Sequence, residues 1–241
     1  MFVIKRRSIL IISVLIITAL TMIFCLGALS KTASGNTGAS KIKIVLDAGH
    51  GGIDGGVTGV NTNVKESDLN LSVVKKLENY LTDAGMTVVL TRSSSAGLYG
   101  VAAGNLKKRD MQKRRDVILK EKPVLVISVH MNKFSSPSRR GAQVFYKADD
   151  GEGKLLADSI QQCFNTMEEA VKKTSALTGD YYMLNCSPYP SVIAECGFLS
   201  NPQDEKLLVT DEYQNSIAYA IFKGVVKYLT EASVSLQESA D

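Results

Sequence analysis

The stretch Val45-Leu46-Asp47-Ala48-Gly49-His50-Gly51-Gly52 joins an apolar strand to a glycine-rich turn. The strand covers residues 42–46 and is apolar at successive positions, which is typical of a strand buried on both faces of a parallel sheet. The glycines that follow permit a tight turn, which would aim the His50 ring inward. Taken alone, His50 is more commonly a loop histidine that caps a turn, so its role depends on what the rest of the chain places beside it.

Strand and helix patterns alternate along the rest of the chain. One helical pattern begins with Ser67 as an N-cap and stops at Gly85, and Pro123 ends a second helix. The predicted strands cover residues 42–46, 86–90, 124–129, 143–146, 181–184 and 192–196, and the predicted helices cover residues 67–84, 106–122, 153–167 and 210–229. This alternation predicts a single α/β domain with a mostly parallel or mixed, twisted sheet of about six strands and helices on both faces.

The second of the chain's two histidines also ends a strand. His130 closes the apolar run over residues 124–129, where the common alternative is a core histidine whose hydrogen bonds are satisfied. Glu195 lies inside a third apolar run, where a charge is costly unless it is paired or functional. Because sites in open α/β sheets form where strands end, His50, His130 and Glu195 are expected to share one crevice.

These residue types suit a metal-dependent hydrolase. Two imidazoles and a carboxylate bind Zn²⁺ while leaving one position open, and a further glutamate can act as a general base on water. Glu66, just before a predicted helix, is a candidate third ligand, but an acid there could equally favour the helix macrodipole. The spacing leaves both interpretations of Glu66 open and excludes the His-Glu-x-x-His motif. Cys196 as a thiol nucleophile is disfavoured, because strand alternation turns it away from Glu195.

Length and composition fit one globular domain rather than a nucleic-acid-binding protein. The chain has 241 residues, and its 45% hydrophobic and 22% charged content is that of an ordinary globular domain. Lys5, Arg6 and Arg7 supply three charges of the formal net charge of +4, so the domain lacks the basic field that nucleic acid requires. The basic stretch over residues 107–122 is mostly a solvated helix face; the alternative is attraction to an anionic polymer such as cell wall.

The N-terminus predicts export. Lys5, Arg6 and Arg7 precede an apolar segment, so residues 1–30 are expected to be a signal peptide or, if uncleaved, a membrane anchor. Either alternative places the domain outside the cytoplasm. Residues 31–40 are expected to form a flexible tether, residues 41–230 the folded domain, and residues 231–241 a polar tail.

The four cysteines do not predict disulfides. Cys25 lies in the apolar N-terminal segment, which leaves Cys163, Cys186 and Cys196 as an odd set without metal-ligand spacing. We expect these three to be buried free thiols.

Five motifs occur in order along residues 41–230. They are Leu46-Asp47-Ala48-Gly49-His50-Gly51-Gly52, Lys65-Glu66-Ser67-Asp68-Leu69-Asn70-Leu71, Thr91-Arg92, Ile127-Ser128-Val129-His130-Met131-Asn132 and Glu195-Cys196-Gly197-Phe198-Leu199-Ser200-Asn201. As an ordered set they resemble the zinc-dependent N-acetylmuramoyl-L-alanine amidases of the amidase-3 type. The resemblance implies a zinc-peptidase-like α/β fold with one Zn²⁺ per domain. It implies His50, Glu66 and His130 as zinc ligands and Glu195 as the catalytic glutamate. Substrate contacts are expected at Asn70, Arg92, Asn132 and Asn201, which lie in the same motifs.

The resemblance also implies a reaction and a setting. The expected substrate is peptidoglycan, cleaved at the amide bond between the lactyl group of N-acetylmuramic acid and L-alanine. The short exported layout is most similar to the sporulation amidases of endospore-forming bacteria, which remove stem peptides from spore cortex before muramic-δ-lactam forms. The expected location is membrane-anchored, or secreted to the cell wall or forespore intermembrane space. Some members of the family depend on a partner protein, so an activating partner is a further expectation.

Two positions depart from the family pattern. Leu119 stands where many members have an asparagine, and Lys122-Pro123-Val124 begins the run before His130 without an acid. These two departures leave the packing of the local helix and the substrate contacts undetermined by the resemblance.

Loops over residues 57–64 and 93–104 are expected to frame the groove. The alternative function is an exported wall-binding protein with this fold and little activity without a partner.

Overall fold

The computed structural model describes residues 42–100 and 104–238, which form one α/β domain. The predicted signal peptide or anchor (residues 1–30) and the tether (residues 31–40) lie outside the described residues. Within the part of the chain that is described, no helix is both long enough and apolar enough to cross a bilayer.

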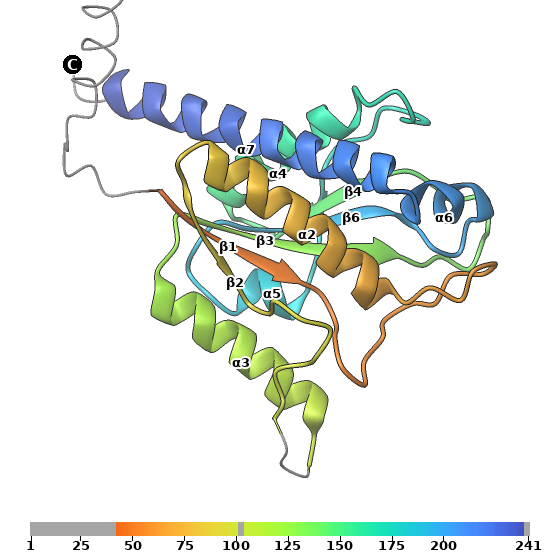
Figure 1. Ribbon diagram of the computed structural model, residues 1–241. Helices are drawn as coiled ribbons and strands as arrows, with labels where there is room; N and C mark the ends of the chain where they lie inside the picture. The colour runs from red at the N-terminus through yellow and green to blue at the C-terminus, as the bar shows by residue number, and fades with distance from the viewer. Residues whose placement is uncertain (1–41, 101–103, 239–241) are drawn as a thin grey trace, which may run out of the picture. The chain divides into compact units, whose positions relative to one another are not determined.

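A mixed sheet of six strands forms the centre of the domain, in the order β2-β1-β3-β6-β4-β5 (Figure 1). The strands are β1 Lys43–Ala48, β2 Thr87–Leu90, β3 Leu125–Asn132, β4 Gln143–Tyr146, β5 Leu177–Thr178 and β6 Ser191–Phe198. β1, β2, β3 and β6 run parallel, whereas β4 is antiparallel to β6 and parallel to β5. The carboxyl ends of β1, β3 and β6 therefore lie along one edge, where sites form in such sheets.

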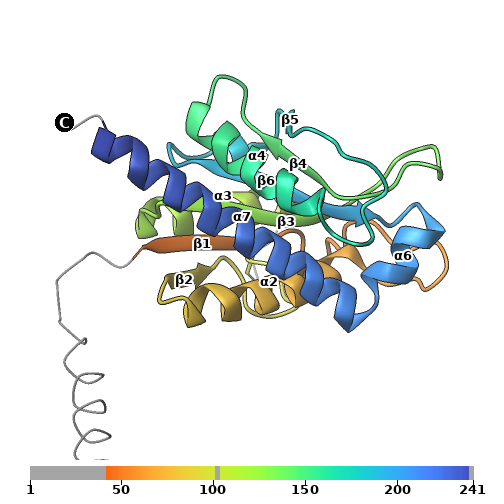
Figure 2. The same ribbon diagram turned by 90° about the horizontal axis from the view of Figure 1, so that it is seen from above.

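Helices cover both faces of the sheet (Figures 1 and 2), which confirms the predicted layers. One face carries α2 (Glu66–Asp83), α4 (Gly151–Phe164) and α7 (Asp211–Glu238). The opposite face carries α3 (Leu106–Glu121) and the one-turn helix α5 (Tyr182–Asn185). A further short helix, α6 (Pro202–Leu208), follows β6.

Alternation along β1 divides the core into two clusters. Ile44 and Leu46 belong to the larger cluster, which includes side chains of α2, α4 and α7. Val45 belongs to the smaller cluster, together with Ile118 of α3. All four side chains are fully buried. A strand that is apolar on both faces thus joins the two helical layers, as its sequence predicted.

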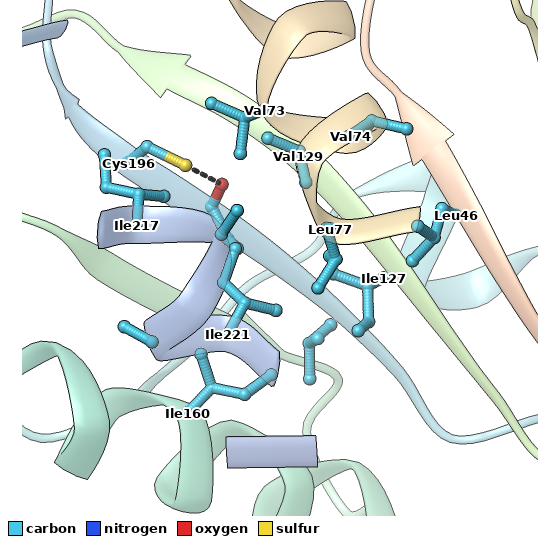
Figure 3. Close-up of a cluster of buried hydrophobic side chains, with 14 of the residues drawn as sticks. Leu46, Val73, Val74, Leu77, Ile127, Val129, Ile160, Cys196, Ile217 and Ile221 are labelled. Atoms are coloured by element: carbon cyan, nitrogen blue, oxygen red, sulfur yellow. Dashed lines mark hydrogen bonds between the residues drawn. The ribbon is translucent and has the colours of Figure 1, made fainter. Parts of the chain in front are cut away.

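Cys196 lies in the larger cluster, beside Ile217 of α7 (Figure 3). Its thiol is fully buried and donates to the carbonyl of Ala194 at 3.6 Å. The prediction that Cys196 points away from Glu195 is confirmed, and a thiol so placed does not reach a substrate. Cys163 and Cys186 are also free, but they are only half-buried, so burial of the thiols was predicted correctly for Cys196 alone.

The predicted strand over residues 181–184 was wrong. These residues lie at the start of α5, and the edge strand is β5 instead. The backbone N–H groups of Leu184 and Asn185 both donate to the carbonyl of Tyr181, at 3.1 and 3.2 Å, which closes a helical turn. An apolar run of this length does not distinguish a strand from one helical turn by its pattern.

Several helix boundaries also differ from the prediction. α2 begins at Glu66 with Lys65 as its N-cap, so Ser67 is inside the helix rather than its cap. α6 was not predicted, although Asn201 caps it by accepting from two backbone N–H groups. α7 continues to Glu238 rather than ending at residue 229, so the expected polar tail is helical as far as the described residues extend.

Candidate metal and catalytic site

Three side chains from separate elements converge at the carboxyl edge of the sheet. His50 follows β1, Glu66 opens α2, and His130 lies near the end of β3. One ligand atom from each lies within 4.8 Å of the others. Oε1 of Glu66 is 3.3 Å from Nε2 of His50 and 2.9 Å from Nδ1 of His130. The two rings meet edge to face, with centroids 5.1 Å apart. The structure therefore brings the three predicted ligands together.

Amide groups hold the carboxylate of Glu66, which is 1% exposed. The backbone N–H of Val57 donates to Oε2 at 2.8 Å. The backbone N–H of Met131 and Nδ2 of Asn70 donate to Oε1 at 3.2 and 3.3 Å. Burial disfavours the charge, but the hydrogen bonds and charges of the two histidines outweigh it and hold the pKa of Glu66 well below its usual value. Glu66 is therefore ionised at neutral pH, as a metal ligand must be.

Two buried arginines support the turn that carries His50. Arg114 of α3 donates to the carbonyls of Ala48 and His50, at 2.7 and 2.5 Å. Arg92, which follows β2, donates to the carbonyls of Ala48 and Gly49, at 2.8 and 2.9 Å. His50 has a φ of 60°, in a region that residues other than glycine seldom occupy. The two guanidinium groups hold the carbonyls on either side of this turn and so maintain its conformation.

Arg114 also belongs to a buried ion-pair network. It donates to the carboxylates of Asp47 and Asp110, both at 2.6 Å. Asp47 accepts further bonds from the hydroxyls of Thr91 and Ser128, each at 2.6 Å. Burial alone would raise the pKa of Asp47, but Arg114 and the two hydroxyls outweigh it and lower the pKa to about 2. The network therefore ties β1 to α3 directly beneath the turn.

Sequence reasoning missed Asp110 and Arg114, because the basic stretch over residues 107–122 was expected to be mostly solvated. α3 buries Asp110, Arg114 and Ile118, which are spaced four residues apart on one face of the helix. That spacing is the signal that could have identified them. The other basic side chains of α3 are exposed or half-buried, so the prediction of a solvated face is correct for much of the helix.

Glu195 of β6 lies opposite His130 in the register of the parallel strands. It is 8% exposed, and its Oε2 has no hydrogen-bond partner among the described residues. Burial raises the pKa of Glu195 to about 7; Glu66 adds to the rise, and the two histidines oppose it. A carboxyl group that titrates near neutral pH can both accept and release a proton.

A cavity of about 600 Å³ opens beside these residues, a size typical of ligand sites. His50, Glu66, His130 and Glu195 all line it. The other walls are largely apolar and aromatic, contributed by Ile53, Val57, Tyr99, Leu106, Met111, Tyr181, Tyr182 and Met183. Val57 and Tyr99 come from the two loops that were expected to frame the groove.

Of the four side chains predicted to contact substrate, Asn132 lines the cavity. The other three are buried and bonded to backbone carbonyls. Asn70 donates to Gly49 at 3.1 Å, and Asn201 donates to Pro137 at 2.5 Å. Arg92 supports the turn already described. Asn70 and Arg92 thus hold Gly49, which lines the cavity, whereas the partners of Asn201 do not line it.

The donor set fits a divalent metal ion. Two imidazole nitrogens and an ionised carboxylate match the three protein ligands of catalytic zinc sites. Nδ1 of His50 lies 3.0 Å from the carboxylate of Asp54, which is the outer partner expected of a metal-binding histidine. Glu195 lines the same cavity, and its buried Oε2 has no hydrogen-bond partner among the described residues.

Comparison with known proteins identifies the family. The family model Amidase_3, described as N-acetylmuramoyl-L-alanine amidase, matches residues 44–227. The germination-specific N-acetylmuramoyl-L-alanine amidase of Bacillus subtilis (strain 168) is 35% identical over 192 residues, which cover 78% of this chain and 80% of that protein. The N-acetylmuramoyl-L-alanine amidase AmiA of Escherichia coli (strain K12) is 27% identical over 243 residues, which cover 83% of this chain and 80% of that protein.

A solved structure extends the comparison to the fold. The CwlD amidase from Clostridioides difficile, in complex with the GerS lipoprotein, aligns with a TM-score of 0.75 at 34% identity. The alignment covers 79% of this chain and 99% of that chain. The family match includes all four converging residues, His50, Glu66, His130 and Glu195. The resemblance seen in the sequence is confirmed: the chain belongs to the Amidase_3 family of N-acetylmuramoyl-L-alanine amidases.

Proposed function

We propose that this chain is a zinc-dependent hydrolase of peptidoglycan that cleaves the amide bond between the lactyl group of N-acetylmuramic acid and L-alanine. The observation that carries the proposal is the convergence of His50, Glu66 and His130 in one cavity with Glu195. Membership of the family supports the identity of the bond, and the donor set supports the metal.

His50, Glu66 and His130 would hold one Zn²⁺ ion per domain. When bound, the ion would supply Lewis-acid polarisation of the lactyl carbonyl and lower the pKa of a water molecule toward about 7. Asp54 would accept a hydrogen bond from the Nδ1–H of His50 and so fix the tautomer that leaves Nε2 free as a ligand. Arg114 would keep the turn that carries His50 in place.

Glu195 would take the proton of the attacking water and pass it to the departing alanine nitrogen. Its pKa of about 7 suits both steps, because the group is a base when ionised and an acid once protonated. The products are a stem peptide with a free alanine amino group and a glycan whose lactyl group ends in a carboxylate.

Asn132 is the residue we propose for direct substrate contact. Its Oδ1 accepts from the backbone N–H of Lys133 at 2.8 Å, which leaves its amide N–H groups available to a substrate carbonyl. Asn70 and Arg92 would act indirectly, by holding the backbone of Gly49 in the cavity wall.

Digestion of purified peptidoglycan by the zinc-loaded protein tests this proposal. We expect free alanine amino groups and free lactyl carboxylates to appear in equal amounts, and neither to appear in the presence of a strong chelator. New reducing sugar ends, or peptides cut without a free alanine amino group, would assign a different bond to the site.

A role in sporulation is proposed from the relatives. The Bacillus subtilis relative is named germination-specific. The similarity to it extends over most of this chain and most of that relative. We propose that this chain removes stem peptides from spore cortex before muramic-δ-lactam forms. Deleting its gene in the native organism should abolish the lactam in cortex muropeptides, and an unchanged lactam content would remove the sporulation role while leaving the hydrolase intact.

Export and a partner protein belong to the same proposal. The enzyme would work outside the cytoplasm, either secreted to the cell wall or forespore intermembrane space or attached to the membrane through residues 8–29 if these are uncleaved.

The CwlD structure contains the GerS lipoprotein, which supports an activating partner here. The second candidate function, a wall-binding protein with little activity alone, is favoured by the same observation. Repeating the digestion with and without a candidate lipoprotein separates the two.

A further inference from the structure

Glu205 of α6 is a buried acid that no step of the proposed reaction uses. It is 1% exposed, and its carboxylate accepts hydrogen bonds from both Asn61 and Thr62. Oε1 accepts from the backbone N–H and the hydroxyl of Thr62, at 2.8 and 2.7 Å. Oε2 accepts from the backbone N–H and the side-chain amide of Asn61, at 2.9 and 2.8 Å. Burial opposes the charge, but these donors outweigh it and lower the pKa of Glu205.

Asn61 and Thr62 form the tip of a hairpin over residues 55–65. The N–H of Gly59 donates to the carbonyl of Val64 at 2.9 Å, and Thr58 and Lys65 form a β-bridge. Gly59 packs against the carboxylate so closely that a Cβ there would lie 2.3 Å from Oε1 of Glu205. The hairpin tip is therefore shaped around a carboxylate 144 residues away in the chain.

The base of the same hairpin holds Glu66. The N–H of Glu66 donates to the carbonyl of Val57 at 2.8 Å, and the N–H of Val57 donates back to Oε2 of Glu66 at 2.8 Å. With Oε2 fixed in this way, Oε1 faces His50 and His130. The position of the hairpin therefore sets the orientation of the carboxylate.

We propose that Glu205 is a positioning residue for the metal site. By anchoring the hairpin tip, it fixes Val57 and, through Val57, the oxygen of Glu66 that faces the two histidines. The inference rests on the metal role of Glu66 in the proposed function. Without the anchor, the hairpin and the carboxylate would have to be ordered when the metal binds, and that ordering costs affinity.

Asp204, the preceding residue of α6, offers a matched control. It is also buried, at 3% exposed. Its carboxylate accepts from the backbone N–H groups of Phe198 and Gly141, at 3.0 and 2.7 Å, and from Arg140 at 3.1 Å. Asp204 therefore anchors β6 and the segment before β4, not the hairpin. Its loss should destabilise the fold without disturbing the carboxylate of Glu66.

The test compares the full-length chain with its Glu205→Gln, Gly59→Ala and Asp204→Asn variants. Zinc Kd is measured by competition with a chromophoric chelator, and the unfolding temperature is measured on the metal-free proteins. Glu205→Gln presents an NH₂ group to N–H donors, and Gly59→Ala displaces the carboxylate from the other side. Both should weaken zinc binding by about tenfold or more, the range found for outer-shell partners of metal ligands. Asp204→Asn should lower the unfolding temperature and leave zinc Kd unchanged.

The outcomes are distinguishable. Unchanged zinc Kd in Glu205→Gln and Gly59→Ala would overturn the proposal. An equal loss in Asp204→Asn would also overturn it, because general destabilisation would then explain the effect. Cobalt substitution gives a second readout, since a misplaced carboxylate should alter the visible absorption of bound Co²⁺ in Glu205→Gln but not in Asp204→Asn. Absence of zinc binding by the unaltered chain would instead overturn the proposed function.

Discussion

Glu195 and Cys196 are neighbours in β6, yet they serve opposite sides of the sheet. Glu195 lines the cavity, and its pKa is raised to about 7. Cys196 is fully buried under α7, and burial raises the pKa of its thiol well above the usual value. Strand alternation therefore gives the cavity a carboxyl group that exchanges protons near neutral pH and gives the core a thiol that does not ionise.

Glu195→Gln should separate metal binding from hydrolysis. The amide has nearly the same volume but takes no proton from water, so kcat should fall by about a thousandfold. Zinc content should remain one ion per domain, because Glu195 is not among the three donors. Metal analysis and wall digestion on one preparation check both statements. Activity close to that of the unaltered enzyme would remove the proton-transfer role.

Asp47→Asn should destabilise the fold in a pH-dependent way. The change leaves Arg114 buried with one fewer carboxylate, which should cost about 3 kcal/mol at neutral pH. The pKa of Asp47 is about 2 in the folded protein, below its ordinary value of 3.8. Its stabilisation is therefore complete above that ordinary value and is lost as the pH falls toward 2. Urea unfolding of both proteins at pH 7 and pH 3 should show a smaller difference at pH 3. An equal difference at the two pH values would contradict the ionic account.

At the scale of elements, α4 and α7 lie side by side on one face of the sheet (Figure 2). Gly224 of α7 allows the close approach, because a Cβ there would lie 2.5 Å from the Cα of Ile160 in α4. Backbone atoms cannot rotate away as side chains can, so the two helices would have to separate to accept a larger residue.

Gly224→Ala should therefore destabilise the protein although alanine favours helices. Alanine gains about 1 kcal/mol of helix propensity, but overpacking against backbone atoms should cost about 3 kcal/mol, the upper end of the typical range, so we expect a net loss of about 2 kcal/mol. Gly151→Ala, in the first turn of α4, is the control, because a Cβ there has open space around it. Thermal unfolding of both variants checks the pair. A more stable Gly224→Ala protein would refute the packing argument.

The helices and strands also differ in how well their own sequences predict them. Continuous apolar runs predicted β1, β3 and β6 closely, a clear helical period predicted α2, and Pro123 predicted the end of α3. The one-turn α5 was mistaken for a strand, and α6 was not predicted, because each is too short to show a period. Their positions depend on tertiary contacts, such as the cap that Asn201 provides.

For the whole molecule, zinc should act as a stabilising ligand. Its three proposed ligands come from residues far apart in sequence, so the unfolded chain lacks the assembled site. Free zinc at 100 times Kd should add about 2.7 kcal/mol to the free energy of unfolding. The unfolding temperature should rise with zinc and fall on chelation. The double variant His50→Ala and His130→Ala should show no such shift, and a shift equal to that of the unaltered protein would place the metal elsewhere.

The sequence predicted those residues of the site whose positions are determined by the ends of strands. His50, His130 and Glu195 follow from parallel strands whose carboxyl ends share an edge. Glu66 was left open by spacing, because its position depends on the hairpin over residues 55–65. The contacts that hold that hairpin come from Glu205, and no local pattern links positions so far apart in the chain. Arg114 escaped notice for a related reason, since its burial depends on carboxylates in other elements.

The sheet order has a consequence for the time at which the site is assembled. β6 is the last strand to be synthesised, yet it lies between β3 and β4. A nascent chain that ends before Ser191 has residues 50, 66 and 130 but leaves the inner edges of two half-sheets unpaired. Insertion of β6 joins the halves and delivers Glu195 in the same event. Of the four residues that line the cavity together, Glu195 is thus the last to reach its place in the sheet.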